Sequence, residues 1–516
     1  MKSRKNSTQF ILSIVASVIA VCLNYAITLI VTPYITESIG VEAYGFISLG
    51  KTFANYASIF TIALNSFSAR YISIEYHKGN IDKANIYFNT VFGADCILGG
   101  MILVSSLGVI GLLDRILTIP IDLVSDVKLL FLLDTCNFLI LSCSTVFMTA
   151  TIIENRLDIG GLVKCLSYMA EGLFLFLAYR LLKPHIFFVG IGLIVSSLVI
   201  LLFNIYITGR YTPELSLKRR CFSKFELKIL VGAGLWNSIN SIGNTLNSGL
   251  DLLFCNMFLS AVRAGQLAIV KTIYMIFSTM YQLVSQPFQP LQLKYYAEEN
   301  KEKLVESFKF GIKLNGMLTN VAFAGFLVFG RIYYELWTPN QETDLLQAIS
   351  VITISGCLIE GAVYPLYYIY TLTVKNKIPC YITLLSGFTN VAGMYVLINY
   401  YSSDVYGVVG TTAVLTWLVN FVFNPCYSAH CLGLRKTVFY PTLVKHIFSG
   451  LVISIVFYMV SCLYLPHNWF TLIIVAIICG GIGCILHSTI MFNKQERQIV
   501  VSYVTRIWEQ LRKDKM

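Results

Sequence analysis

The chain is a succession of apolar stretches, each about as long as a bilayer-crossing helix. A transmembrane helix needs about 20 mostly apolar residues, and scanning at that length predicts about fourteen of them, with twelve or thirteen as the alternatives. A chain with this pattern folds as an all-α polytopic membrane protein, because its backbone must be hydrogen-bonded internally. The expected spans are 10–31, 44–67, 86–112, 127–150, 163–182, 186–207, 229–250, 265–288, 311–336, 346–371, 380–400, 407–430, 442–464 and 470–492.

Composition excludes the other broad classes. Charged residues make up 13% of the chain and hydrophobic residues 56%, whereas soluble domains carry about 25% charged residues. So few charges cannot cover the surfaces of soluble domains, which excludes soluble enzymes, nucleic-acid-binding proteins and secreted disulfide scaffolds. The cysteines form no Cys-x-x-Cys pair and no metal-ligand spacing, so we interpret them as small apolar side chains.

The loops between spans differ strongly in charge. Lys and Arg gather at the N-terminus, in alternate loops, in the segment Gly209–Lys228 and in the tail from Lys494. The opposite loops hold Arg115, Lys183 and Arg263. Basic loops stay cytoplasmic, so we expect an even number of spans with both termini in the cytoplasm. Topology also explains most of the net charge of +11 without a nucleic-acid partner.

A weak internal repeat connects the two halves. A shift of 220 positions takes residues 40–88 onto 260–308 and aligns Gly45 with Gly265, Lys51 with Lys271, Thr52 with Thr272, Ser58 with Ser278, Tyr76 with Tyr296, Asn80 with Asn300, Lys83 with Lys303 and Phe88 with Phe308. Parallel repeats of this kind are a transporter architecture with the substrate site between the halves.

The repeat predicts a domain plan. We expect an N-terminal lobe of spans 1–6 (1–208), a basic cytoplasmic linker (209–228), a C-terminal lobe of spans 7–12 (229–430) and two further spans (431–492). A basic amphipathic tail follows (493–516), with Ile499, Tyr503, Ile507 and Leu511 on one helical face. Such a helix lies on anionic lipid; the alternative is a frayed tail.

Ionisable residues inside the membrane are costly, and each one is a candidate for function. They are Lys51, Asp95, Asp134, Glu171, Lys271, Lys313, Glu360 and His487. Lys51 and Lys271 occupy equivalent places in the repeat, and two ammonium groups facing one cavity would bind an anion such as a pyrophosphate. The alternative is that each lysine pairs with a carboxylate or snorkels to the surface.

Two further sets of polar residues have two interpretations each. Glu360, just before Tyr364 and the helix-breaking Pro365, is a candidate ion or proton site or the partner of a buried lysine, and Asp134 and Glu171 are similar. A stripe of four amides in span 7 would bind sugar hydroxyls in a wet cavity or hold helices together. This stripe consists of Asn237, Asn240, Asn244 and Asn247.

The sequence contains no catalytic constellation. We find no paired carboxylates at a loop, no Ser/His/Asp set and no metal-ligand cluster, so we expect neither an enzyme nor a cofactor. A polyprenyl-sugar polymerase or transferase would usually carry a long external loop or a cytoplasmic catalytic domain, and the predicted loops leave room for neither.

Several segments resemble bacterial polysaccharide transporters. The opening Asn24-Tyr25, Thr32-Pro33-Tyr34-Ile35 and Ser38-Ile39-Gly40-Val41-Glu42-Ala43-Tyr44-Gly45-Phe46 is similar to that of O-antigen and capsule repeat-unit flippases. These belong to the multidrug/oligosaccharidyl-lipid/polysaccharide exporter superfamily. Later matches are Trp236 to Asp251, Gln286-Pro287-Phe288, Glu335-Leu336-Trp337 and Gly407-Val408-Val409-Gly410.

The resemblance implies a fold and a function. Members have two six-helix lobes in a V and move undecaprenyl-pyrophosphate-linked oligosaccharides to the outer leaflet of the bacterial inner membrane, for O-antigen, lipopolysaccharide, capsule or exopolysaccharide biosynthesis. It implies a lipid-linked oligosaccharide substrate, cationic residues such as Lys51 and Lys271 for the pyrophosphate, H+ or Na+ as a coupling ion, and contact with polysaccharide polymerase machinery. The alternative within the superfamily is a multidrug antiporter, which would favour an unpaired acidic cavity.

Overall fold

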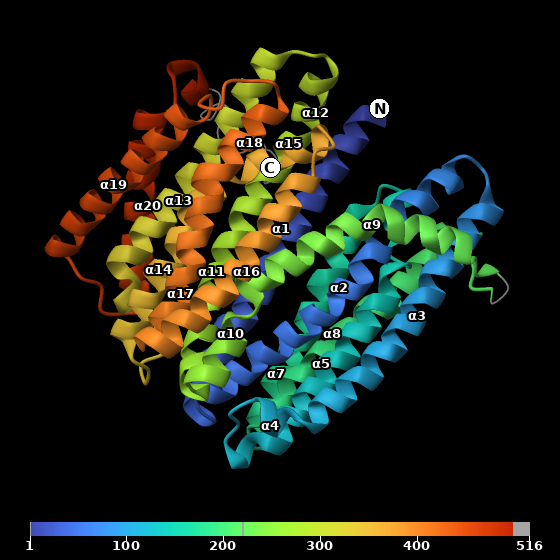
Figure 1. Ribbon diagram of the computed structural model, residues 1–516, viewed down its shortest axis with the longest axis horizontal. Helices are drawn as coiled ribbons and strands as arrows, with labels where there is room; N and C mark the ends of the chain where they lie inside the picture. The colour runs from blue at the N-terminus through green and yellow to red at the C-terminus, as the bar shows by residue number, and fades with distance from the viewer. Residues whose placement is uncertain (1, 219–220, 499–516) are drawn as a thin grey trace, which may run out of the picture. The chain divides into compact units, whose positions relative to one another are not determined.

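The predicted spans are all helical in a computed structural model, which describes residues 2–218 and 221–498 (Figure 1). The described ranges contain no β-strand, which confirms the all-α fold class. The helices that carry the predicted spans are α1 Lys2–Ser38, α2 Val41–His77, α3 Ile81–Gly111, α5 Val124–Thr145, α7 Leu157–Leu181, α8 Phe187–Tyr211, α9 Lys224–Asn244, α11 Ala261–Ser285, α13 Lys301–Trp337, α14 Thr343–Val363, α16 Lys377–Tyr401, α17 Asp404–Trp417, α19 Tyr440–Leu463 and α20 Trp469–Met491.

Short helical segments connect or extend these spans. Three of them, η3, η4 and η7, are π-helical, a local widening that often occurs at functional sites. The short segments are α4 Leu113–Ile116, η1 Ile121–Leu123, α6 Thr149–Ile153, η3 Thr245–Gly249, α10 Asp251–Phe254, η4 Cys255–Leu259, η5 Gln286–Phe288, α12 Gln289–Ala297, η6 Tyr364–Leu366, α15 Tyr367–Leu372, η7 Leu418–Phe423 and α18 Asn424–Cys431.

In the described part of the chain, 12 helices are long and apolar enough to cross a membrane. The two predicted spans outside that set are α2 and α9. Both are long helices that carry polar side chains along their length, including Lys51 and Asn55 on α2 and Asn237 and Asn244 on α9. The polar side chains lower the hydropathy of both helices, and three of them, Lys51, Asn237 and Asn244, are candidate residues from the sequence.

The repeat has a counterpart in local structure. α2 covers Val41–His77 and the continuous segment Ala261–Ala297 covers α11 and α12, each with 37 residues and with both ends related by the 220-residue shift. The helices that follow begin alike. The side chain of Asn80 accepts a hydrogen bond from the Lys83 backbone at 3.3 Å, and that of Asn300 from Lys303 at 3.1 Å. These paired asparagines are N-caps, which satisfy a free N–H at the start of a helix.

The chain packs as two compact units. Unit 1 contains the described residues up to Ile269 together with Cys380–Val405, and unit 2 contains Val270–Pro379 with the described residues from Tyr406 onward. The division falls inside α11 and near the starts of α16 and α17. It describes packing, whereas the lobe limits drawn from the repeat, 1–208 and 229–430, remain a prediction.

Within unit 1, the linker between α8 and α9 is bound along α3. Asn85 donates to the carbonyl of Glu214 at 2.8 Å and accepts from the N–H of Ser216 at 2.9 Å. One turn later, Asn89 donates to the carbonyl of Ser216 at 2.9 Å and accepts from the N–H of Lys218 at 2.6 Å. The two buried amides thus pair with the extended linker backbone as a neighbouring β-strand would. We call this contact the linker clamp.

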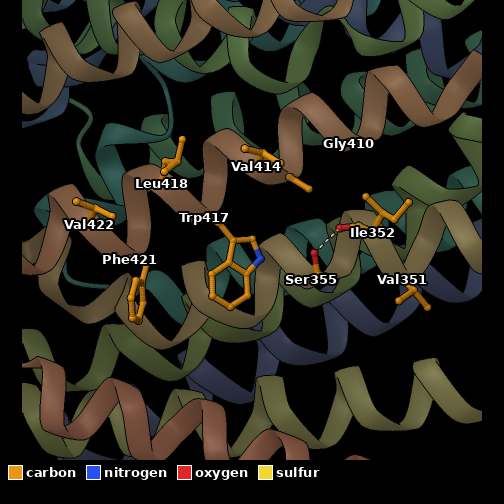
Figure 2. A pocket seen from close by; sticks show the side chains of 10 residues that line it. Val351, Ile352, Ser355, Gly410, Val414, Trp417, Leu418, Phe421 and Val422 are labelled. Atoms are coloured by element: carbon orange, nitrogen blue, oxygen red, sulfur yellow. Dashed lines mark hydrogen bonds between the residues drawn. The ribbon is translucent and has the colours of Figure 1, made fainter. Parts of the chain in front are cut away.

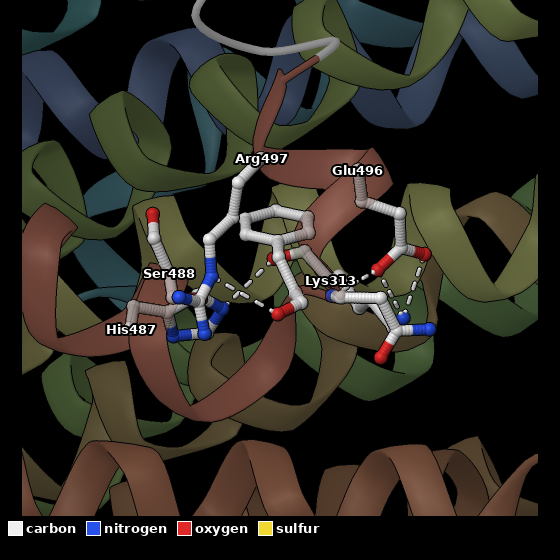
Figure 3. Close-up of polar contacts among 7 residues, drawn as sticks. Lys313, His487, Ser488, Glu496 and Arg497 are labelled. Atoms are coloured by element: carbon white, nitrogen blue, oxygen red, sulfur yellow. Dashed lines mark hydrogen bonds and ion pairs between the residues drawn. The ribbon is translucent and has the colours of Figure 1, made fainter.

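Within unit 2, the start of the tail is fixed to α13 and α20 (Figure 3). The Lys313 ammonium lies 2.7 Å from a carboxylate oxygen of Glu496. Arg497 donates to the carbonyls of Ser488, Thr489 and Phe492 at 2.8 to 3.1 Å and so caps the end of α20. The predicted amphipathic face, Ile499, Tyr503, Ile507 and Leu511, lies outside the described residues.

Candidate functional site

Lys51 lies on α2 of unit 1 with its side chain exposed. No hydrogen bond or ion pair joins it to another residue in the described part of the chain. An exposed ammonium within a predicted span faces water or a polar ligand more favourably than lipid. Lys51 is thus available to an anion.

Two buried carboxyl groups lie near Lys51. Asp134 on α5 is 2% exposed, packs against the backbone of Gly50, and has no hydrogen-bond partner for either oxygen among the described residues. Glu171 on α7 is 5% exposed, and its Oε2 also lacks such a partner. The Lys51 ammonium is close enough to attract both carboxyl groups electrostatically. Hence the same lysine can serve as their counter-charge or as an anion ligand.

Unit 2 contains the second lysine and the third candidate carboxylate. Lys271 on α11 is half-buried. Glu360, near the end of α14, is also half-buried, and its carboxylate accepts hydrogen bonds from the hydroxyls of Tyr274 and Tyr281 on α11. Pro365 follows in η6, where the α-helical ladder breaks. The tyrosines give Glu360 the polar partners that Asp134 lacks.

The two lysines occupy matching places in the predicted repeat, whereas Asp134 and Glu360 correspond only in the order of their spans. Lys51 and Lys271 lie on the second and eighth spans, while Asp134 and Glu360 lie on the fourth and tenth. The 220-residue shift takes Lys51 onto Lys271, but it takes Asp134 onto Ile354, six residues before Glu360. Each half of the chain thus contains a lysine and a carboxylate, although the carboxylates differ in position and surroundings.

The four asparagines of span 7 have different environments. Asn247, in η3, donates to the carbonyl of Thr383 on α16 at 2.9 Å and accepts from the Ser386 hydroxyl at 2.8 Å. Its amide therefore holds two helices together. Asn237 and Asn244 are exposed and Asn240 is half-buried, and none of these three amides bonds another side chain in the described ranges. Exposed amides within a predicted span are more stable in contact with water than with lipid.

The remaining intramembrane candidates have structural partners. Asn65 donates to Asp95 at 3.0 Å. Lys313 pairs with Glu496 in the tail. His487 lies 3.0 Å from the Ser449 hydroxyl. It also lies 2.9 Å from the carbonyl of Lys313 (Figure 3). These contacts satisfy Lys313 and His487, whereas the second carboxylate oxygen of Asp95, which is 1% exposed, has no hydrogen-bond partner among the described residues.

An apolar cavity of about 540 Å³ lies in unit 2 between α14 and α17–η7 (Figure 2). Its lining includes Ile352, Val414, Trp417 and Phe421, and the hydroxyl of Ser355 donates to the Ile352 carbonyl at 2.7 Å. It contains no ionisable side chain, so it does not suit a diphosphate. None of the candidate site residues identified from the sequence lines this cavity.

No group of three or more His, Cys, Asp or Glu side chains in the described ranges could hold a metal ion. Asn55 is a polar residue that the sequence analysis missed. It lies four residues after Lys51 and is exposed on the same helix, and the spacing of Lys51, Asn55 and Ser58 was the signal.

Comparison with known proteins gives the fold but no named family. No family model matches the chain. The uncharacterized membrane protein EpsK of Bacillus subtilis (strain 168) is 25% identical over 494 residues, which cover 96% of this chain and 97% of EpsK.

Solved structures similar to the chain include a lipid II flippase and a multidrug resistance transporter. The lipid II flippase MurJ, in an inward closed conformation, has a TM-score of 0.67 with 14% identity, covering 94% of this chain and 100% of MurJ. An inward-facing MATE multidrug resistance transporter of the MOP superfamily has a TM-score of 0.65 with 14% identity, covering 80% of this chain and 98% of the transporter. The chain has the exporter fold of the MOP superfamily.

Proposed function

We propose that the protein is a flippase. It moves undecaprenyl-pyrophosphate-linked oligosaccharide repeat units from the inner to the outer leaflet of the bacterial cytoplasmic membrane, by alternating access. The observation that carries the proposal is the exposed Lys51 within a predicted span, which the repeat pairs with Lys271. An anionic headgroup needs such cations, whereas a cationic drug would be repelled by them.

Each candidate residue has a role in this proposal. Lys51 and Lys271 bind the pyrophosphate, and Asn237, Asn240, Asn244 and Asn247 supply polar groups toward the sugars, with Asn247 already bonded to α16. Asp134, Glu171 and Glu360 take up the coupling ion, H+ or Na+. The product feeds O-antigen, capsule or exopolysaccharide assembly, where contact with a polymerase is expected, and both termini lie in the cytoplasm.

A multidrug antiporter is the second candidate. The MATE likeness and the buried, unpartnered carboxyl oxygens of Asp134 favour it, since acidic groups attract cations. A membrane polymerase or transferase is a third and less well supported function, because the short loops leave no room for a catalytic domain.

The test is rescue of surface polysaccharide in a strain that lacks its own repeat-unit flippase. The wild-type chain should restore the polysaccharide, and the double variant Lys51→Ala/Lys271→Ala should not, at equal protein in the membrane. Resistance to cationic drugs without rescue would contradict the flippase and favour the antiporter.

A further inference from the structure

Asn55 is the exposed polar neighbour of Lys51. It lies four residues further along α2, so both side chains project from one side of the helix. Its amide forms no hydrogen bond with another described residue, and it lies within the predicted span 44–67. Asn55, like Lys51, therefore faces water or a polar ligand.

The packing of α2 on α9 fixes which residues stand at the same depth. The backbone of Gly234 contacts that of Ala63, and the hydroxyl of Ser238 donates to the carbonyl of Ile59 at 2.9 Å. The helices are antiparallel, since four residues forward on α9 correspond to four back on α2. Continuing that register puts Asn55 level with Ile242 and Lys51 level with Leu246.

Asn244 stands between those two levels and is exposed. Two other directions of α9 are occupied, since Gly234 and Ser238 face α2 and Gly243 contacts the backbone of α16 at Leu384. Val231, Leu235 and Ile242 form a separate exposed side of α9 that is apolar. Lys51, Asn55, Asn237 and Asn244 thus lie on the uncovered polar surface of one helix pair. We call this surface the amide face.

The chemistry of the amide face has two parts. The Lys51 ammonium suits a diphosphate. The neighbouring amides each donate and accept hydrogen bonds, as sugar hydroxyls require, and, being neutral, they lack the charge attraction that an ammonium has for a diphosphate. A cation beside neutral amides matches the junction at which a sugar is joined to a diphosphate.

We propose that Asn55, together with Asn244, binds the first sugar of the substrate, so that the amide face distinguishes a glycosyl diphosphate from a bare lipid diphosphate. This rests on the proposed function, to which it adds a residue and a selectivity. Asn55 is a specificity residue in this account, and Lys51 provides affinity for both lipids.

The test compares two lipid probes on the full-length protein in nanodiscs. The probes are undecaprenyl diphosphate and undecaprenyl diphosphate bearing one N-acetylhexosamine. Losing one hydrogen bond of about 0.5–1.5 kcal/mol weakens binding by about two- to tenfold. Asn55→Leu should weaken the sugar-bearing probe by that factor and leave the bare probe unchanged. Phe60→Leu, at a 67% exposed site on α2, is the control and should change neither.

Three results would overturn the inference: equal weakening of both probes by Asn55→Leu, no weakening of either, or a wild-type protein with no preference for the sugar-bearing probe. The variant Lys51→Ala distinguishes a failure of this inference from a failure of the proposed function. It should weaken both probes, and if it weakens neither, the diphosphate role itself fails whatever Asn55 does.

Discussion

At the scale of single residues, the central feature is one exposed lysine beside two buried carboxyl groups. Asp134 and Glu171 lie in an environment that disfavours an unpaired negative charge, and the Lys51 ammonium compensates both electrostatically. A diphosphate that binds Lys51 would compete with them for the same cation. Their uptake of a proton or Na+ would relieve that competition.

This arrangement predicts how Lys51 behaves when the carboxyl groups are neutralised. If Lys51 binds the substrate, Lys51→Ala should lower transport at least tenfold both in the wild type and in the Asp134→Asn/Glu171→Gln background. If Lys51 were only a counter-ion, its loss would be harmless once the acids were amides. Transport rate per molecule of protein in the membrane distinguishes the two, and Lys51→Arg, which keeps the charge, serves as the matched control.

The ion pair between Lys313 and Glu496 gives a second prediction, for stability. Removing one member of a largely buried pair leaves an uncompensated charge and costs about 3 kcal/mol. Glu496→Ala should therefore lower the melting temperature in detergent, and Lys313→Met added to it should recover most of the loss. A double variant no more stable than Glu496→Ala would show that the pair has no stabilising role.

At the scale of elements, the sequence predicted the long helices, of which 12 in the described ranges are apolar enough to cross a membrane, but not how the polar helices are packed. The spans are predictable because about 20 apolar residues can only cross the bilayer as a helix. The linker clamp was not, because it joins Asn85 and Asn89 on α3 to backbone atoms more than a hundred positions away. The partner of Lys313 was hidden for the same reason, since Glu496 follows the last span.

The linker clamp predicts protection from protease. Asn89→Leu removes the bonds to the Ser216 carbonyl and the Lys218 N–H, at a cost of about 1–3 kcal/mol. Limited trypsin digestion of inside-out vesicles should then cut faster at Lys218, Arg219 and Arg220. Asn399→Leu, an exposed asparagine on α16, should leave the cleavage rate unchanged; equal cleavage of Asn89→Leu and wild type would argue against a clamp.

Two glycines on α9 test the packing that aligns the amide face. A Cβ on Gly234 would collide with the backbone of Ala63, whereas a Cβ on Gly232 would meet nothing within 4 Å. Gly234→Ala should destabilise the protein by about 1–3 kcal/mol. Gly232→Ala should be neutral or stabilising, because alanine favours a helix over glycine. Equal melting temperatures for the two variants would contradict the α2–α9 contact.

At the scale of the whole molecule, the fold was more predictable than the site. The hydropathy pattern predicted the helices. The internal repeat paired residues that have the same local structure, as Asn80 and Asn300 do, each of which caps the start of a helix. The likeness to MurJ and to a MATE transporter confirms the exporter fold. The site was less predictable. Asn237 and Asn244 are exposed, whereas Asn247 is bonded to the neighbouring helix, and the regular spacing of these residues in the sequence does not show which of them is exposed.

The most direct test of the account is transbilayer movement in proteoliposomes. Vesicles containing the purified protein and an undecaprenyl-pyrophosphate-linked oligosaccharide would be treated with a membrane-impermeant glycosidase, and the protected fraction of the lipid followed with time. The account predicts that the wild-type protein exposes the inner-leaflet pool and that Lys51→Ala/Lys271→Ala does not. An unchanged protected fraction with the wild-type protein, in vesicles that do transport a cationic dye, would contradict it.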